Sequence, residues 1–199
     1  TWNVNASVSY NKNELTELYN GITEYVASDT GRMVAVGHPL GEFYLNRYAG
    51  VNPTNGDALW YTKDGEITTE YNESDKVMLG KTHEAPWQGG FGTTLSWQGF
   101  SLSAQFTWVA DRWMLNNDRV FQESNGLFSA YNQSKRMLYD RWKKPGDVTD
   151  IPRYGVTPQL DSRFLEDASF LRLKNLMLSY TFPQKWLQRT NFVMSARIY

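Results

Sequence analysis

One stretch, residues 91–110, limits the possible folds more than any other part of the chain. Its sequence is FGTTLSWQGFSLSAQFTWVA, and Gln98-Gly99 has the residue types of a two-residue hairpin turn. Folding about that turn places successive side chains on opposite faces of a two-stranded sheet. One face is then apolar and aromatic, with the cross-strand pairs Trp97–Phe100, Leu95–Leu102, Thr93–Ala104 and Phe91–Phe106. The opposite face carries small polar residues.

Two details of this hairpin favour a membrane over a soluble sheet. Its polar face has no Lys, Glu or Asp before Asp111, which is unusual for a sheet face exposed to water. Its aromatic residues also cluster by depth, because Trp97 and Phe100 flank the turn and Trp108 lies about 26 Å further along the strand at ~3.3 Å per residue. Transmembrane β-barrels have an apolar band of about 25 Å between two aromatic girdles. A sandwich hairpin that covers a soluble core alternates in the same way and stays an alternative.

The rest of the chain predicts about six strands joined by alternating short and long connections. Residues 1–10 alternate like the hairpin, and a return strand is expected within 32–49. Residues 50–88 and 112–167 read as long connections, and a last strand begins near residue 170. Short turns on one side and long loops on the other are typical of outer-membrane barrels.

Each long connection predicts some local structure. Asp64-Gly65 is a turn signal that could join residues 58–62 to 66–70 in a small hairpin. Residues 127–143 could form a helix, because apolar side chains recur near one side. We therefore expect an all-β, antiparallel barrel segment with long extracellular loops, one of which contains a short helix.

The stretch 168–183, ASFLRLKNLMLSYTFP, raises a question about which face its cations occupy. Strict alternation places Arg172 and Lys174 in one row, followed by the apolar side chains of Leu176, Leu178, Tyr180 and Phe182. In a membrane, this row would put both cations at the outer headgroup layer, beside lipopolysaccharide phosphates or a loop carboxylate. A β-bulge between residues 170 and 176 would instead turn them to the lumen.

Composition narrows the class of protein without deciding it. The 199 residues carry a formal net charge of −1, which gives no electrostatic support for nucleic-acid binding. Without cysteine, the sequence has neither a disulfide framework nor a thiolate metal site. It has no apolar run of about 18 residues, so a transmembrane helix is not expected. No signal peptide is visible, and both ends read as strands in progress, so a piece of a longer protein is expected.

Five segments carry a resemblance to a known family. They are SVSYNKNELTELY (7–19), VGHPLGEFYLNRYAGVNPTNGDALWY (36–61), GGFGTTLSWQGFSLSAQFTW (89–108), RWKKPGDVTDIPRYG (141–155) and SRFLEDASFLRLKNLMLSYTFP (162–183). Their sequences and their order resemble SusC/RagA-type TonB-dependent outer-membrane transporters. The last segment is similar to the C-terminal signature of that family, and together the segments cover nearly the whole chain.

The resemblance implies a plugged barrel of about 22 strands in the bacterial outer membrane. It implies import of glycans or peptides in Bacteroidetes, with a SusD-like surface lipoprotein as a lid and TonB acting through the plug. Outer-membrane lipid and lipopolysaccharide would surround the barrel, and no nucleic acid is expected as a partner. Residues 1–199 would form the C-terminal part of the barrel domain, without the plug domain. The family resemblance implies no enzyme activity and no cofactor.

Aromatic residues are the candidates for functional contacts. Those expected in extracellular loops could stack on substrate or dock on the lid protein, although packing between loops is the simpler interpretation. They are Trp60, Tyr61, Trp87, Trp113, Tyr131 and Trp142. A second set is expected to face lipid as a girdle: Trp97, Phe100, Trp108, Tyr180 and Phe182.

The sequence offers no catalytic constellation. His38 and His83 are far apart without an obvious partner, so a structural or loop role is expected for each. Carboxylates gather late in the chain, and a calcium site is conceivable. Their spacing does not match an EF-hand, so ion-paired or solvated carboxylates are the better prediction, with Arg141, Lys143, Lys144 and Arg153 as counter-charges. They are Asp140, Asp147, Asp150, Asp161, Glu166 and Asp167.

Two functional hypotheses follow from the sequence. The first is a segment of a SusC/RagA-like nutrient importer, and the second is a soluble β-sandwich that binds carbohydrate through loops rich in Trp and Tyr. The sequence leaves open whether the substrate is a glycan or a peptide, which loop residues touch it, and the oligomeric state.

Overall fold

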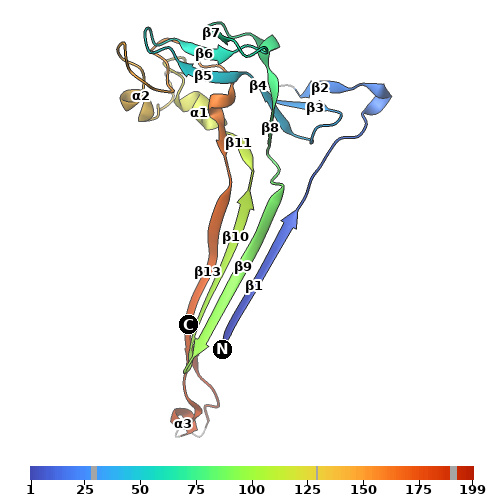
Figure 1. Cartoon of the computed structure of the whole chain (residues 1–199). Coiled ribbons are helices and arrows are strands. Elements are labelled where there is room, and N and C mark those ends of the chain that lie inside the picture. Colours follow the sequence, from blue (N-terminus) through green and yellow to red (C-terminus); the bar gives the residue numbers. More distant parts are fainter. Residues whose placement is uncertain (28–30, 129, 189–191) are drawn as a thin grey trace. The chain divides into compact units, whose positions relative to one another are not determined.

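The chain divides into two compact units (Figure 1). The structure is a computed structural model that describes residues 1–27, 31–128, 130–188 and 192–199. The sheet unit comprises Thr1–Asn11, Ala85–Asp111 and Ser169–Tyr199, and the loop unit comprises Lys12–Glu84 and Arg112–Ala168. Among the described residues, no helix has the length and apolar character needed to cross a membrane.

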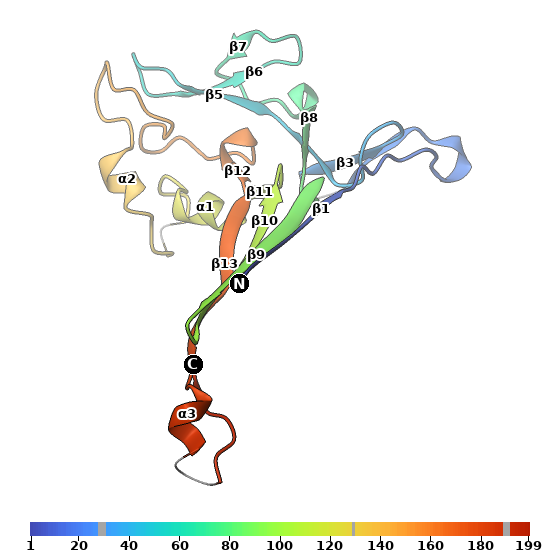
Figure 2. The same ribbon diagram turned by 60° about the horizontal axis from the view of Figure 1, so that its bottom comes forward.

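The sheet unit is a single antiparallel sheet. Its order is β1-β9-β10-β13-β14, and Figures 1 and 2 both show the four long strands side by side. A short helix, α3 (Gln184–Leu187), follows β13. The strands are β1 (Trp2–Tyr10), β9 (Trp87–Trp97), β10 (Phe100–Ala110), β13 (Phe170–Thr181) and β14 (Arg197–Ile198).

The hairpin of β9 and β10 has the register that the sequence predicts. Gln98 and Gly99 both have positive φ, 46° and 90°, as a two-residue hairpin turn requires. Phe100 pairs with Trp97, and the pairs continue without a shift to Ala110 and Trp87. The apolar face of the sheet therefore takes the odd residues of β9 and the even residues of β10. The polar face takes the others, including two hydroxyl pairs, Thr94–Ser103 at 3.1 Å and Ser96–Ser101 at 3.0 Å.

The prediction that the first strand pairs with a return strand within residues 32–49 is wrong. β1 pairs directly with β9, from Trp2 with Leu95 to Tyr10 with Trp87, and its even residues extend the apolar face. The return strand expected within 32–49 is absent from this sheet, because β4 (Glu42–Leu45) and β5 (Arg47–Val51) belong to smaller sheets. The described part of the large sheet thus has five strands instead of six. Glycines at 37 and 41, both with positive φ, interrupt any long strand in that region.

A β-bulge in β13 decides the face of the two cations. Gln105 pairs with Asn175, but the next residue, Phe106, pairs with Leu173, so Lys174 is the extra residue. The alternation of β13 therefore reverses at Lys174. Arg172 pairs with Thr107 and joins the polar face, while Leu171 and Leu173 take the apolar side. The expected lipid-side row of cations is wrong, and the bulge alternative is confirmed.

The loop unit consists of small sheets and short helices. β2 (Glu24–Ala27), β3 (Arg32–Ala35), β4 and β8 (Val77–Thr82) form one sheet, and β5, β6 (Ala58–Tyr61) and β7 (Ile67–Thr68) form another. The pairing of β6 with β7 confirms the expected small hairpin around Asp64-Gly65. The remaining elements are β11 (Trp113–Leu115), β12 (Leu165–Asp167), the α-helices α1 (Asn117–Gln122) and α2 (Arg136–Tyr139), and the 3-10 helices η1 (Tyr19–Gly21), η2 (Glu73–Asp75) and η3 (Ser162–Phe164).

The helix expected over 127–143 is largely wrong. Of that range only Arg136–Tyr139 is helical, and residue 129 lies outside the described residues. The chain turns at Asn125 and Gly126, which have positive φ of 55° and 97°, and the side chain of Asn125 donates to Val156 O at 3.0 Å. Contacts with a distant segment therefore override the local helical pattern, as tertiary packing often does.

The buried core lies in the loop unit. Phe43, Leu45 and Leu165 are nearly inaccessible and pack with four half-buried apolar residues from β8, β11 and the segment before η3. The sheet unit differs, because its large apolar side chains lie on the surface. Trp2 is 71% exposed, Leu176 is 62% exposed and Leu178 is 61% exposed.

Candidate functional site

The apolar face of the sheet unit ends in two groups of aromatic side chains. Beside the Gln98-Gly99 turn, the ring of Phe100 lies 4.6 Å from Tyr180, and Tyr180 lies 5.2 Å from Phe182. Trp97 pairs with Phe100 on the same face and is 68% exposed. All four are residues that the sequence predicts as a girdle, and the sheet brings them to one level.

The second aromatic group lies at the other end of the strands. Trp108 pairs with Gly89, and a Cβ on that glycine would lie 2.9 Å from the indole, so the missing side chain makes room for the ring. One step further, Trp87 lies 4.4 Å from Tyr10. Trp87 was expected in a loop, but it is the first residue of β9 and belongs to this aromatic level. Phe91 and Phe106 stack at 4.7 Å between the two levels.

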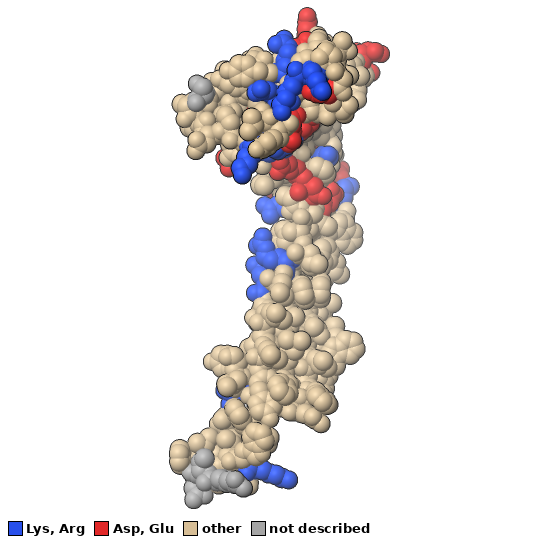
Figure 3. Space-filling model, turned by 90° about the vertical axis from the view of Figure 1, so that its left-hand side faces the viewer, with Lys and Arg blue, Asp and Glu red and all other residues tan. Residues whose placement is uncertain are grey.

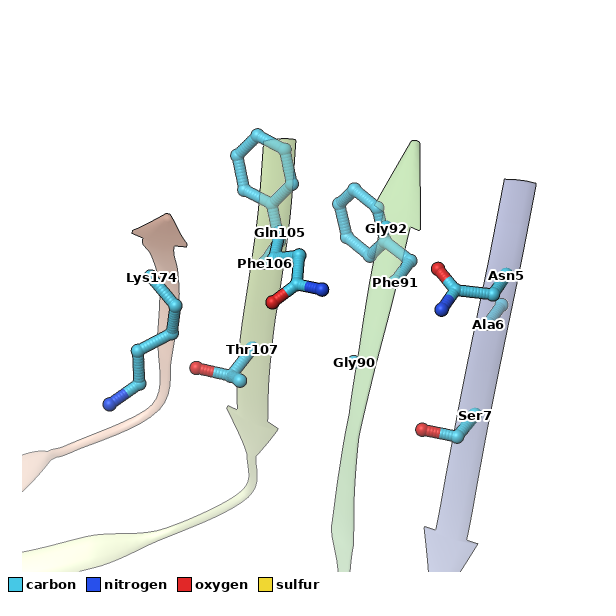
Figure 4. Close-up of a pocket in the computed structure, with 10 residues that line it drawn as sticks. All are labelled: Asn5, Ala6, Ser7, Gly90, Phe91, Gly92, Gln105, Phe106, Thr107 and Lys174. Carbon is cyan, nitrogen blue, oxygen red and sulfur yellow. The ribbon is translucent and has the colours of Figure 1, made fainter. Parts of the chain in front are cut away.

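The polar face of the sheet unit carries a groove of about 310 Å³ over β9. Gly90 and Gly92 form its floor, and Figure 4 shows polar side chains on either side of them. Asn5 leans over Gly92, where a Cβ would meet its Oδ1 at 2.4 Å. The polar side chains that line the groove are Asn5 and Ser7 from β1, Gln105 and Thr107 from β10, and Lys174 from β13.

The side-chain charges on the five strands of the sheet unit are of one sign. Its five strands contain Arg172, Lys174 and Arg197 but no Asp or Glu among the described residues. Arg197 donates to the Ser179 hydroxyl at 2.6 Å, and Arg172 lies 4.6 Å from the Phe170 ring. Figure 3 shows one side of the molecule, on which most of the surface of this unit is uncharged. A neutral polar face with a few cations is suited to a wet channel wall and not to a packed core.

A network of ion pairs organises part of the loop unit. Glu123 is 1% exposed and accepts hydrogen bonds from Arg119 at 3.0 and 3.1 Å and from Arg136 at 2.7 Å. Arg136 Nη2 also donates to both carboxylate oxygens of Asp150, at 2.7 Å each. Arg119 reaches Glu166 at 2.6 Å, and this hydrogen bond is the largest cause that holds the pKa of Glu166 below its usual value.

A second buried group surrounds Trp60. Its indole Nε1 donates to Asp161 Oδ2 at 2.7 Å, and Tyr71 and Tyr48 lie edge-on at 5.6 and 6.2 Å. Burial raises the pKa of Asp161, although the hydrogen bonds from Trp60 and the Arg163 N–H act in the opposite direction. Burial also raises the pKa of Tyr48 and that of Tyr71, the latter to about 12. Trp60 therefore packs the loop unit together and, at 5% exposed, offers little surface to a ligand.

The other expected loop aromatics lie at separate places in the loop unit. Tyr61 lies under the guanidinium of Arg47, at 5.4 Å. Trp113 lies against the core with Lys81 Nζ 3.4 Å above its ring, and Trp142 Nε1 donates to Pro53 O at 3.2 Å. Tyr131 is 61% exposed and is the most accessible of the six expected loop aromatics. The structure does not bring these residues together in one aromatic cleft.

The late carboxylates are held by protein donors. Asp140 and Asp150 pair with Arg136, Glu166 pairs with Arg119, and Asp147 accepts from the backbone N–H groups of Lys143 and Lys144. The ion-paired interpretation is confirmed for Asp140, Asp150 and Glu166, but their counter-charges are Arg119 and Arg136. Of the expected cations, Arg153 pairs with Asp57. Within the described ranges, no group of three or more His, Cys, Asp or Glu is placed to hold a metal ion.

Sequence reasoning missed several of these residues. Glu42 is 3% exposed and accepts from the Gly80 N–H at 2.6 Å and contacts His38 Nδ1 at 2.9 Å. The Arg119–Glu123 contact has the i, i+4 spacing of a helical ion pair, which a search of residues 117–123 could have found. The groove has no comparable local signal, because its side chains come from four strands.

Comparison with proteins of known sequence and structure identifies the family. The solved structure of the RagAB peptide transporter matches 98% of this chain with a TM-score of 0.88 and 38% sequence identity. The chain belongs to the SusC/RagA-type TonB-dependent transporters. Its full length aligns with TonB-dependent receptor P3 of Formosa agariphila at 25% identity and with TonB-dependent receptor SusC of Bacteroides thetaiotaomicron at 23%. No protein-family model matches it.

The family confirms the expected architecture and location. The chain spans about a fifth of the length of these relatives: 21% of receptor P3, 20% of SusC and 22% of the RagAB chain. The antiparallel, all-β barrel segment with long loops is thus confirmed as a fold class, and the family places the chain in the bacterial outer membrane. Within that setting, the apolar face is the side of the sheet suited to lipid.

Proposed function

We propose that the protein containing this chain imports oligopeptides or glycans across the outer membrane. The observation that carries the proposal is a sheet with an exposed aromatic face on one side and an uncharged polar face with a few cations on the other. In a closed barrel such a wall presents its apolar face to the bilayer outside and its polar face to the water inside. The likeness to a peptide transporter at 38% identity favours peptides as the first substrate class to test.

Residues 1–199 would supply wall and loops within the C-terminal part of the barrel domain. β1, β9, β10 and β13 would form the wall, with Trp97, Phe100, Trp108, Tyr180 and Phe182 at the lipid interfaces. Both long connections leave the sheet at the end opposite the Gln98-Gly99 turn, as expected for extracellular loops. No enzymatic step is assigned to the chain.

The partners follow from the family and remain part of the proposal. A SusD-like surface lipoprotein would cover the extracellular opening, and TonB would supply energy from the periplasm through a part of the protein outside this chain. Lipopolysaccharide and lipid would contact the girdle. Of the loop aromatics, Tyr131 is the best candidate for contact with substrate or lid because its ring is accessible, whereas Trp60 is enclosed.

Uptake by cells tests the import function. Cells that carry the full-length protein should accumulate fluorescent oligopeptides or glycans, and deletion of TonB or of the protein should abolish that accumulation. Co-purification from detergent-solubilised membranes tests the lipoprotein partner. Undiminished uptake without TonB would contradict the proposal.

The soluble carbohydrate-binding module has a separate test. A soluble module should fold as a monodisperse chain of residues 1–199 without detergent. We expect that chain to aggregate or to require detergent, because its apolar rows are exposed along β1 and β13. Monodisperse folding without detergent would favour the soluble module.

A further inference from the structure

The groove on the polar face combines three features that do not follow from its role as a wall. It has a floor without side chains at Gly90 and Gly92, neutral hydrogen-bonding groups on both rims, and one ammonium group at its edge. In Figure 4, Asn5 and Gln105 approach from opposite sides of Gly92, and Lys174 lies beside Thr107. An extended ligand can therefore lie close to the backbone of β9 while side chains contact it from both sides.

Lys174 is placed in the groove by the bulge. A regular β13 would carry the even residue 174 on the apolar face with Leu176 and Leu178, so the extra residue is what turns the side chain toward the polar side. No ion pair involves Lys174 among the described residues, and the strands of the sheet unit contain no carboxylate to neutralise it. Within the described strands, the positive charge of Lys174 is therefore not balanced by a carboxylate.

The neutral lining complements that charge. Asn5 and Gln105 can donate through their amides, and Ser7 and Thr107 through their hydroxyls. The Thr107 Oγ1 is buried and has no hydrogen-bond partner in the described structure. Buried hydroxyls in proteins are normally hydrogen-bonded, so rotation of the Thr107 side chain would make this hydroxyl available to a polar group in the groove.

We propose that this groove is a carboxylate-binding subsite for the imported ligand. The inference rests on the proposed import function and adds a substrate class to it, namely acidic oligopeptides. Lys174 contacts the carboxylate, and the neighbouring amides and hydroxyls hydrogen-bond to the adjacent peptide groups. One ion pair in a wet, open groove is weak enough to release the ligand, as a transport pathway requires.

A competition experiment with the full-length protein tests the subsite. The probe is an equimolar mixture of hexapeptides in matched pairs that differ only by Glu or Gln, each acetylated and amidated at its ends. After equilibrium binding to the protein in detergent, mass spectrometry gives the bound ratio of each pair. We expect the Glu peptide to be enriched about two- to fivefold by the wild type. Lys174→Gln should bring the ratio to one, and Lys174→Arg should preserve the enrichment.

Controls separate this proposal from the function on which it rests. Lys185→Gln, which removes the same charge from α3 outside the sheet, should leave the enrichment unchanged. A wild type that binds both peptides of each pair equally overturns the subsite but leaves peptide import standing. A wild type that binds neither peptide overturns both.

A chemical cross-link excludes a permanent partner. A water-soluble carbodiimide couples a lysine amine to a carboxylate that touches it. In the ligand-free, full-length protein, we expect the Lys174 amine to stay uncoupled, and to couple to the Glu peptide once that peptide is bound. Coupling of Lys174 to an acidic side chain of the protein itself would overturn the proposal, because the charge would then be neutralised permanently.

Discussion

The negative charge of a single side chain, Glu123, matters for the stability of its surroundings in the loop unit. The carboxylate is enclosed, and two arginines from α1 and α2 reach it within 3.1 Å. A buried carboxylate of this kind is tolerated only because the arginines and their hydrogen bonds compensate its desolvation. Removing the charge leaves two cations facing each other across the same space.

Glu123→Gln should therefore destabilise this part of the loop unit by about 3 kcal/mol, the lower end for breaking a buried ion pair, because both arginines keep some solvent contact. Hydrogen exchange of the amides in α1 and α2 of the full-length protein measures the opening free energy. Asp118→Asn, an exposed change in the same helix, is the matched control and should have little effect. Equal protection in both variants would contradict a structural role for the network.

Glu166 gives the same region a pH dependence. Its folded pKa lies below the unfolded value of about 4.3, so its contact with Arg119 stabilises the fold above pH ~4.3 and is lost as pH falls through the lower folded pKa. Hydrogen exchange of β11 and β12, corrected for intrinsic rates, should show faster opening as pH falls through this window. Glu166→Gln should remove this step, and persistence of the full step in the variant would assign it to another group.

At the scale of elements, glycines let the strands of the sheet unit approach each other. A Cβ on Gly89 would lie 2.3 Å from the Ser7 carbonyl oxygen, a backbone atom that cannot move aside. A Cβ on Gly92 would crowd the Asn5 side-chain amide, which can rotate away, and would lie at an ordinary contact distance of 3.5 Å from Gln105 Cγ. The two glycines occupy opposite faces of β9, three positions apart.

Gly89→Ala should thus destabilise the pairing of β1 with β9 by about 1–3 kcal/mol, while Gly92→Ala should cost little. To compare the two variants, each full-length barrel is heated before gel electrophoresis. The measured quantity is the temperature at which the gel mobility of the folded barrel is lost. An equal shift for both would mean that the strands adjust at Gly89 as easily as side chains do at Gly92.

The faces of the hairpin are tested by two adjacent residues. Ala104 lies on the apolar face, midway between the levels of Phe100 and Trp108, and Ser103 lies on the polar face. Ala104→Arg should impair assembly into the outer membrane, because an arginine on the lipid side near the midplane costs about 2–4 kcal/mol. Ser103→Arg should assemble normally. Membrane fractionation of cells that carry each full-length variant gives the answer, and similar levels of both in the membrane would contradict the assigned faces.

The sequence predicted the elements whose signals are local. The turn at Gln98-Gly99 and strict alternation were enough for the register of β9 and β10 and for the faces of β1. The pairing of β1 with β9 joins residues that are 77 to 93 positions apart, from Tyr10 with Trp87 to Trp2 with Leu95, so no local pattern could reveal it. The bulge at Lys174 depends on the register of β10 against β13, and from the sequence it could be foreseen only as an alternative.

The candidate site was predicted less completely than the fold. The girdle residues follow from alternation and depth, both of which are readable from the sequence. Trp60 and Trp142 were candidates for ligand contact, with packing between loops as the simpler interpretation. Their indole N–H groups donate to Asp161 and Pro53 within the protein. The groove needs side chains from four strands, and its positions become adjacent only after the sheet is assembled.

For the molecule as a whole, the central claim is that one sheet separates lipid from an aqueous lumen. The described strands end at open edges, β1 on one side and β14 on the other, and such edges are tolerated in a bilayer only when further strands pair with them. The chain's match to about a fifth of each relative agrees with a wall completed by other parts of the protein. The distribution of charge agrees too, since the five strands of the sheet unit carry no Asp or Glu and their cations lie toward the polar side.

A cysteine scan of β10 and β13 tests this claim most directly. Residues 1–199 contain no cysteine, so single spin-labelled cysteines can be placed in an otherwise cysteine-free full-length protein. At each position, the contact of the label with oxygen in lipid is compared with its contact with a water-soluble relaxation agent. In β10, positions 102, 104 and 106 should contact lipid and positions 103, 105 and 107 should contact water. In β13, positions 176 and 178 should contact lipid, and past Lys174 the pattern should reverse so that 171 and 173 contact lipid and 172 contacts water. Alternation in β13 without this reversal, or no lipid contact at any position, would contradict the account.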